Sequence, residues 1–205
     1  DGSVRRADDV TAHLNVISQV GSQAGGSMAA RNARAALLRK GPSVLPRILA
    51  AMDTPNIVAA NWYRSVFEQI LSRTPPQSIP RELLLSYVRD SKRQGRLRRR
   101  SLQLLETLQP GTRVSLLPKM LDDREFREDA VQYVLQKGKG LRQAGKKAQA
   151  AAAFKTAFAH ARRSDQVTAA ADNLKSLGAT VNIVKHMGFV TRWHLLGPFD
   201  APGTS

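Results

Sequence analysis

The chain contains no cysteine, and this absence excludes several kinds of chemistry at once. Disulfides, cysteine nucleophiles and thiolate metal sites cannot form, while the redox compartment stays undetermined. Aromatic residues are also scarce, at 5% of the chain, although 42% of the residues are apolar. A core must therefore consist mostly of Leu, Ala, Val and Ile, a composition that suits closely packed helices.

Other absences bear on membranes and catalysis. No apolar run approaches the roughly 18 residues that a membrane-spanning helix requires, so no membrane span is expected. The chain starts at Asp1 without a charged segment followed by an apolar one, so we expect a signal peptide to be absent or already removed. It lacks a Gly-x-Ser-x-Gly elbow, a Gly-x-Gly-x-x-Gly loop after a strand and a Walker-type loop. No two histidines stand at metal-ligand spacing on a helix. We therefore predict a protein that is not an enzyme, with no catalytic residues, no cofactor and no metal ligands.

Acidic residues are few: 16 Asp and Glu stand against 32 Lys and Arg, which leaves a net charge of +16. The excess is concentrated in two runs without any acid, residues 92–100 with a net charge of +6 and residues 130–164 with +8. Such asymmetry indicates attraction to a polyanion, an acidic protein or an anionic surface.

A short phrase recurs along the chain. Leu45-Pro46-Arg47-Ile48-Leu49 returns in residues 117–121 as Leu-Pro-Lys-Met-Leu, and a weaker version occupies residues 79–84. A period of about 36 residues is typical of two-helix repeats, which bury their apolar faces by stacking. We interpret the phrase as the second helix of about three repeat pairs. The sequence thus predicts an all-α, right-handed α-α superhelix, a HEAT-like solenoid of about eight to ten helices.

The helical segments follow from apolar spacing and from residues that start or stop helices. We expect Asp8-Asp9 to cap the first helix, and Asn56 to begin a longer one with an inward face of Ile57, Ala60, Tyr63 (or Trp62), Phe67, Ile70 and Leu71. Further helices are expected over residues 28–40, 80–91 and 95–108. The loop carboxylates Asp53, Asp90 and Asp122 are expected to cap the helices that follow them.

The second half differs in style. Gly138, Leu141, Gly145, Ala150, Phe154 and Ala157 have the spacing of a tetratricopeptide repeat, in which small residues let two helices approach closely and Phe154 fills the space between them. We predict three segments: HEAT-like repeats over 1–129, a tetratricopeptide-like hairpin with a capping helix over 130–178, and a short extended tail over 179–205. Residues 190–205 have strand-like composition and indicate the opening of a β domain absent from this chain.

Two features stand out as candidate binding sites. The basic runs offer Lys92, Arg93, Arg96, Arg99, Arg100, Lys139, Arg142, Lys146 and Lys147 as contacts for a polyanion or a partner. Trp62 follows an asparagine early in its helix and marks a candidate partner surface. The alternative for each basic run is a solvated helix face, and for Trp62 a packing role with its indole N–H satisfied by a neighbouring loop.

Several of these phrases together resemble a known family. They are residues 59–64 (Ala-Ala-Asn-Trp-Tyr-Arg), the Leu-Pro-x-x-Leu helices, residues 120–123 (Met-Leu-Asp-Asp) and the tail over 189–200, with its Trp-His-Leu-Leu-Gly-Pro-Phe. They resemble HEAT-repeat (armadillo-type) segments of large multidomain bacterial proteins. The resemblance implies that the tail leads into a β-sandwich domain and that the full protein is exported, to the periplasm or the cell surface. It implies no catalytic residues, because none are defined for such segments.

The function expected from these observations is that of a non-catalytic scaffold. It would mediate protein–protein interaction or position an adjacent domain of the same chain. The alternative is binding of nucleic acid, in particular the DNA backbone, through the basic faces. The sequence has few aromatics for stacking on single strands, which makes nucleic acid the second choice. The sequence does not indicate an oligomeric state.

Overall fold

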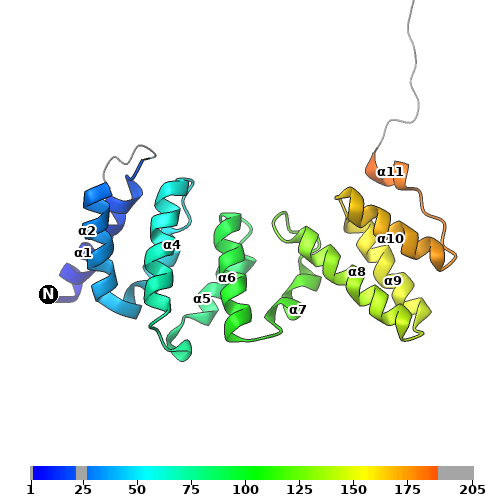
Figure 1. Ribbon diagram of the computed structural model, residues 1–205, viewed down its shortest axis with the longest axis horizontal. Coiled ribbons are helices and arrows are strands. Elements are labelled where there is room, and N and C mark those ends of the chain that lie inside the picture. Colours follow the sequence, from blue (N-terminus) through cyan, green and yellow to red (C-terminus); the bar gives the residue numbers. More distant parts are fainter. Residues whose placement is uncertain (1, 22–26, 189–205) are drawn as a thin grey trace, which may run out of the picture. The chain divides into compact units, whose positions relative to one another are not determined.

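The computed structural model describes residues 2–21 and 27–188, and this part of the chain is all-helical, as predicted (Figure 1). The chain divides into two compact units, residues 1–115 (unit 1) and 116–205 (unit 2). The predicted boundary after residue 129 would fall inside a helix, α8 (Arg127–Gln143). The predicted β-domain opening over residues 190–205 lies outside the described residues.

Unit 1 is built from three successive helical hairpins. Their members are α1 (Gly2–Ser18) with α2 (Ser27–Lys40), α3 (Leu45–Ala51) with α4 (Ile57–Leu71), and α5 (Arg81–Arg89) with α6 (Gly95–Leu108). Short 3-10 helices, η1 (Gly41–Val44) and η2 (Pro76–Ser78), precede α3 and α5, and α7 (Thr112–Leu116) follows α6. Figure 1 shows the second helices of the three hairpins, α2, α4 and α6, next to one another. We call these three helices the second-helix row.

The recurring Leu-Pro phrase marks the first helix of a hairpin, and its interpretation as the second helix was wrong. Leu45-Pro46 begins α3 and Ile79-Pro80 leads into α5. The third copy, Leu117-Pro118, lies in the 3-10 helix η3 (Leu117–Lys119). Proline suits the start of a helix because the N–H that it lacks would have had no partner there. The α1/α2 hairpin has no Leu-Pro phrase. Because this hairpin comes first, α3 and α5 are the first helices of the pairs that follow.

The core of unit 1 follows the predicted apolar spacing except at Ile57, and the predicted cap of the first helix is not formed. Tyr63, Phe67 and Ile70 are buried on α4, and the Tyr63 hydroxyl donates a hydrogen bond to the carbonyl oxygen of Leu14 (2.7 Å). Ile57, expected on the same inward face, is the first residue of the helix and is 64% exposed. Helix α1 begins at Gly2, so Asp9 does not cap it; the Asp9 carboxylate pairs with the side chains of His13 and Lys40.

Asn56 caps α4 as predicted and also ties two hairpins together. Its Oδ1 accepts hydrogen bonds from the backbone N–H groups of Val58 (3.0 Å) and Ala59 (3.2 Å). Its Nδ2 donates to the carbonyl oxygens of Ser18 and Val20, both at 3.1 Å, where α1 ends. One side chain therefore satisfies two unpaired N–H groups of one helix and two carbonyl groups near the end of another.

We expect Asn56→Ala to lower the free energy of unfolding of unit 1 by about 2 kcal/mol, because it removes a cap and both inter-helix bonds. Asn56→Asp keeps the capping oxygen but loses the two donors, so it should lie between wild type and alanine. Urea unfolding of the three proteins measures the order. Equal stability of the aspartate and alanine variants would contradict a role for the cap itself.

Unit 2 is a tight hairpin of α8 and α9 (Lys147–His160), against which α10 (Ser164–Ser176) packs. Gly138 is the point of closest approach: a Cβ atom built on it would lie 2.6 Å from Cε1 of the Phe154 ring. Phe154, Ala150 and Ala157 are fully buried between the helices. The predicted close approach of two helices through small residues is therefore present, and α10 is the expected capping helix.

Two local expectations for unit 2 need correction. Part of the predicted extended tail is helical: α11 (Ile183–Met187) is capped by the Asn182 side chain, which accepts from the Lys185 N–H (2.8 Å), and ends at Gly188 with a φ of 71°. The second concerns the start of α8. Asp123, not Asp122, accepts the backbone N–H groups there, from Glu125 and Phe126.

Candidate functional site

The first basic run divides into side chains that hold the fold and side chains that face solvent. Arg98 is 2% exposed, and its Nε and Nη2 donate to the carbonyl oxygen of Val88 at 3.1 and 2.8 Å. Because Val88 lies in the last turn of α5, its carbonyl has no partner within that helix. Arg98 therefore links α6 to the end of α5 and contributes nothing to the surface charge.

Arg93 and Arg100, both predicted as partner contacts, are also engaged within unit 1. Arg93 pairs with the carboxylates of Asp53 (3.1 Å) and Asp90 (3.2 Å), and its guanidinium lies 4.0 Å from the centre of the Tyr87 ring. The other oxygen of Asp53 accepts the backbone N–H of Gln94 at the start of α6. The loop carboxylate of one hairpin thus binds the backbone where a helix of the next hairpin begins, and does not cap the helix that follows it.

On the second-helix row, Arg100 shares a carboxylate with a neighbouring helix. Its Nε lies 3.3 Å from Oε1 of Glu68, an atom that Arg64 Nε also approaches at 2.8 Å. Arg100 Nη1 also donates to the side-chain oxygen of Gln103 (3.0 Å). One carboxylate therefore serves two guanidinium groups, so this contact between α4 and α6 keeps an excess of positive charge.

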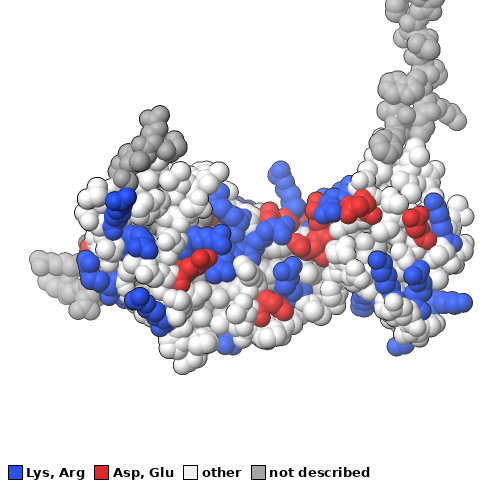
Figure 2. Space-filling model, viewed as in Figure 1, with Lys and Arg blue, Asp and Glu red and all other residues white. Residues whose placement is uncertain are grey.

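The remaining residues of the first run, Lys92, Arg96 and Arg99, are exposed. Arg96 and Arg99 extend along the outer face of α6, as the helical spacing predicts. The three helices of the second-helix row together contain nine Lys and Arg residues, of which Arg98 is buried, against two acids, Glu68 and Glu106. Figure 2 shows Lys and Arg atoms gathering over these helices around a small acidic cluster.

Glu106, the second acid of the row, is engaged with the backbone. Its oxygens accept the N–H groups of Arg113 (2.7 Å) and Gly111 (2.9 Å), and these bonds hold the pKa of the carboxyl below its ordinary value. Both acids of the row are thus taken up by intramolecular contacts, and the exposed guanidinium groups dominate its potential.

Trp62 lies on the same row and borders an open depression of about 540 Å³ between α2 and α4. The lining side chains are Arg31 and Arg34 from α2 and Asn61, Trp62 and Ser65 from α4. Arg34 donates to Oε1 of Gln69 (2.5 Å), which fixes its guanidinium beside α4 without neutralising it. Trp62 is half-buried, and its indole N–H has no hydrogen-bond acceptor among the residues described.

Sequence reasoning identified Trp62 and the α6 arginines separately, and the structure places them on adjacent helices of one row. It missed Arg31 and Arg34, because α2 carries no long run of charge. Their spacing of three residues on a helix without a single acid was the available signal.

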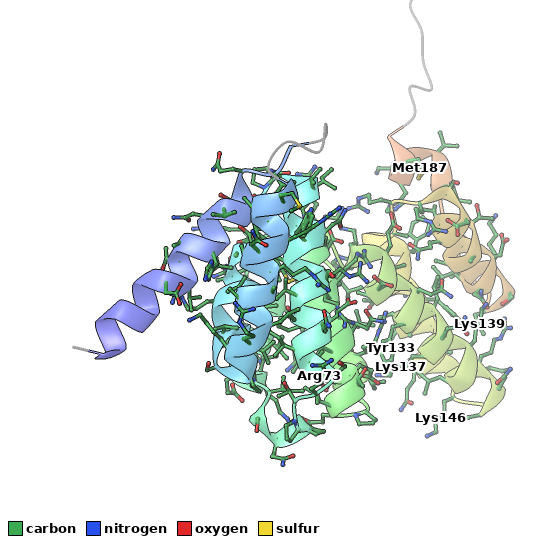
Figure 3. All side chains as sticks on the ribbon, turned by 60° about the vertical axis from the view of Figure 1, so that its left-hand side comes forward. Arg73, Tyr133, Lys137, Lys139, Lys146 and Met187 are labelled. Carbon is green, nitrogen blue, oxygen red and sulfur yellow. The ribbon has the colours of Figure 1, made fainter. Side chains whose placement is uncertain are left out.

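The second basic run lies in unit 2 and does not form one face. Lys137 and Tyr133 lie on one side of α8 and Lys139 on another, while Lys146 lies at the turn between α8 and α9 (Figure 3). Lys139 is half-buried, and Arg142 donates to the Ser176 hydroxyl (3.2 Å). Lys146 and Lys147 are exposed. The exposed cations of this run are therefore dispersed, in contrast to those of the second-helix row.

The described residues contain no group of three or more His, Cys, Asp or Glu side chains that would hold a metal ion. Within the same residues, no helix is both long and apolar enough to cross a membrane. The described histidines other than His186 each face one carboxylate, His13 with Asp9 (2.9 Å) and His160 with Asp122 (3.0 Å). His186 Nε2 lies 3.0 Å from the Ala161 carbonyl oxygen.

No protein-family model, curated protein or solved structure matches the chain.

Proposed function

We propose that the chain is a non-catalytic helical-repeat module that binds an acidic segment of a partner protein through its second-helix row. The partner is a separate protein or an adjacent domain of a larger exported protein. The observation that carries the proposal is the imbalance of this row, where both carboxylates are already bound and several guanidinium groups remain exposed. Guanidinium groups suit carboxylate recognition because their planar fork matches two oxygens.

A nucleic-acid backbone is the competing partner, since phosphates attract the same cations. Trp62 is the one aromatic of the row that is not buried: Tyr63 and Phe67, its neighbours on α4, are 2% and 1% exposed. A groove for single strands would need successive stacking platforms, and the row offers one. The shortage of aromatic side chains on the row favours a protein segment over a nucleic acid.

We expect the double variant Arg31→Glu/Arg96→Glu to bind a fluorescently labelled polyglutamate peptide at least about tenfold more weakly than wild type at low ionic strength. Both side chains are exposed, and neither pairs with a carboxylate among the residues described. The matched control is Arg81→Glu/Arg89→Glu, which changes the net charge by the same amount. Both of its residues are exposed on α5, which is the first helix of its hairpin and lies outside the second-helix row. Fluorescence anisotropy gives both affinities.

The proposal predicts a change smaller than about twofold for the control, because charges away from the row act only through the screened long-range field. Equal losses in the two double variants would mean that net charge, rather than the row, attracts the peptide. Tighter binding of duplex DNA than of polyglutamate under the same salt conditions would favour the nucleic-acid alternative instead.

A further inference from the structure

We infer that the depression between α2 and α4 is a specificity subsite, which takes one large apolar side chain from the acidic segment of the partner. This inference rests on the proposed function and deepens it. The occupant to which the geometry points is a peptide with an aromatic residue flanked by carboxylates. The aromatic ring would pack on Trp62, and the carboxylates would meet Arg31 and Arg34.

The position of Trp62 on its helix supports an external role. Trp62 is not among the buried residues of α4. Those residues are Ala59, Ala60, Tyr63, Val66, Phe67 and Ile70. Tryptophan is among the residues most often found at the centre of binding interfaces, because it combines a large apolar area with one N–H donor. Here part of the ring and its N–H are left without a partner in the described structure.

The surroundings of Trp62 define the chemistry of the ligand. Among the described residues, two guanidinium groups, one amide and one hydroxyl line the depression beside the indole, and none of these residues is a carboxylate. Gln69 is neutral, so its hydrogen bond orients Arg34 and leaves the positive charge in place. Asn61 and Ser65, one turn apart and both exposed, provide donors and acceptors for a peptide backbone. The Trp62 ring lies beside the fixed positive charge of Arg34. A ligand that matches both has an apolar residue next to an acidic one, and either residue alone would match only half of the site.

The volume is consistent with one side chain and its flanking backbone. A depression of about 540 Å³ exceeds a single aromatic side chain and lies within the range of small-ligand sites. With one half-buried aromatic, Trp62, it offers a single anchor point for a segment whose remaining contacts run over α4 and α6.

The test compares two peptides of equal charge, one a run of glutamates with a central phenylalanine and the other with serine in its place. Trp193→Phe leaves Trp62 as the only tryptophan, so its fluorescence reports on the depression directly. We expect the phenylalanine peptide to bind about tenfold more tightly and to change the Trp62 emission. In Trp62→Ala, with affinity measured by anisotropy, the two peptides should bind equally and as weakly as the serine peptide binds wild type.

The control variant is Ile57→Ala, which removes another exposed apolar side chain from α4 and should leave the preference for phenylalanine unchanged. Far-UV circular dichroism of each variant confirms that its helices are intact. Equal binding of both peptides to wild type overturns the subsite and leaves the proposed function standing. Failure of both peptides to bind overturns both. Tighter binding of a single-stranded oligothymidine, with a change in Trp62 emission, overturns the protein partner in favour of nucleic acid.

Discussion

Replacing Arg98 by alanine is expected to lower the free energy of unfolding of unit 1 by about 3–4 kcal/mol. The substitution removes a long side chain that is 2% exposed and leaves a cavity between α5 and α6. It also takes both donors away from the Val88 carbonyl oxygen, which has no helical partner of its own. Urea unfolding followed by the fluorescence of Trp62, in the Trp193→Phe background, measures the loss.

Arg96→Ala is the matched control, since it is the same substitution two residues earlier in the same helix. Arg96 is exposed and makes no hydrogen bond or ion pair with another described residue, so we expect a change within about 0.5 kcal/mol. The two variants should exchange rank in the peptide-binding assay, where Arg96 contributes and Arg98 does not. Arg98→Lys keeps the charge but lacks the two-donor fork, and should recover only part of the stability. A small, equal effect of both alanine variants would show that burial of Arg98 contributes little.

Gly138→Ala is expected to destabilise the α8/α9 hairpin by about 2–3 kcal/mol, although alanine is normally the better helix former. The added Cβ would lie within 3.0 Å of three atoms of the Phe154 ring. That ring is fully buried in a helix pair that contains several alanines, so it cannot move aside without separating the helices. Hydrogen exchange of the amides in α8 and α9 measures the effect within unit 2.

The chain provides a control of opposite sign two residues further on. A Cβ at Gly140 meets no atom within 4 Å, so Gly140→Ala should stabilise α8 by about 0.5–1 kcal/mol through its helix propensity alone. Adding Phe154→Leu to Gly138→Ala tests the cause directly, because the smaller side chain gives the new methyl group room. A cost of Gly138→Ala that is unchanged in the Phe154→Leu background would contradict steric contact as its origin.

The residues at these two sites show how far local pattern carries the prediction. The spacing of Gly138, Ala150, Phe154 and Ala157 was enough to expect two closely packed helices. The residues that meet across a helical hairpin are close in sequence, so their spacing indicates the contact. The positions of the unit 1 helices were predicted for similar reasons, from apolar spacing, from proline at helix starts and from Asn56 as a cap. The phrase was assigned to the wrong helix of each hairpin, because α1/α2 lacks it.

Charge was harder to interpret than hydrophobic spacing. Arg98 stands in a row of basic residues, and counting charges assigns it to the surface. Its phase on the helix, one residue after Leu97 and three before Ser101, places it among the buried residues. Helical phase alone would therefore have predicted its burial. No local pattern predicts that the Val88 carbonyl is within reach, since that depends on how α5 ends against α6.

The sequence alone was sufficient for the helical class, for the bounds of several helices, for the Gly138–Phe154 contact and for the excess of positive charge, because these properties depend on residues near one another in the chain. Packing of the helices gave the basic residues their separate partners: the Val88 carbonyl for Arg98, carboxylates for Arg93 and Arg100, and solvent for Arg96. It also brought Trp62 beside Arg31 and Arg34, which are about 30 residues away in the chain. Electrostatic and aromatic contacts act over a few ångströms in space, so the partners of each charge depend on tertiary packing that local sequence does not encode.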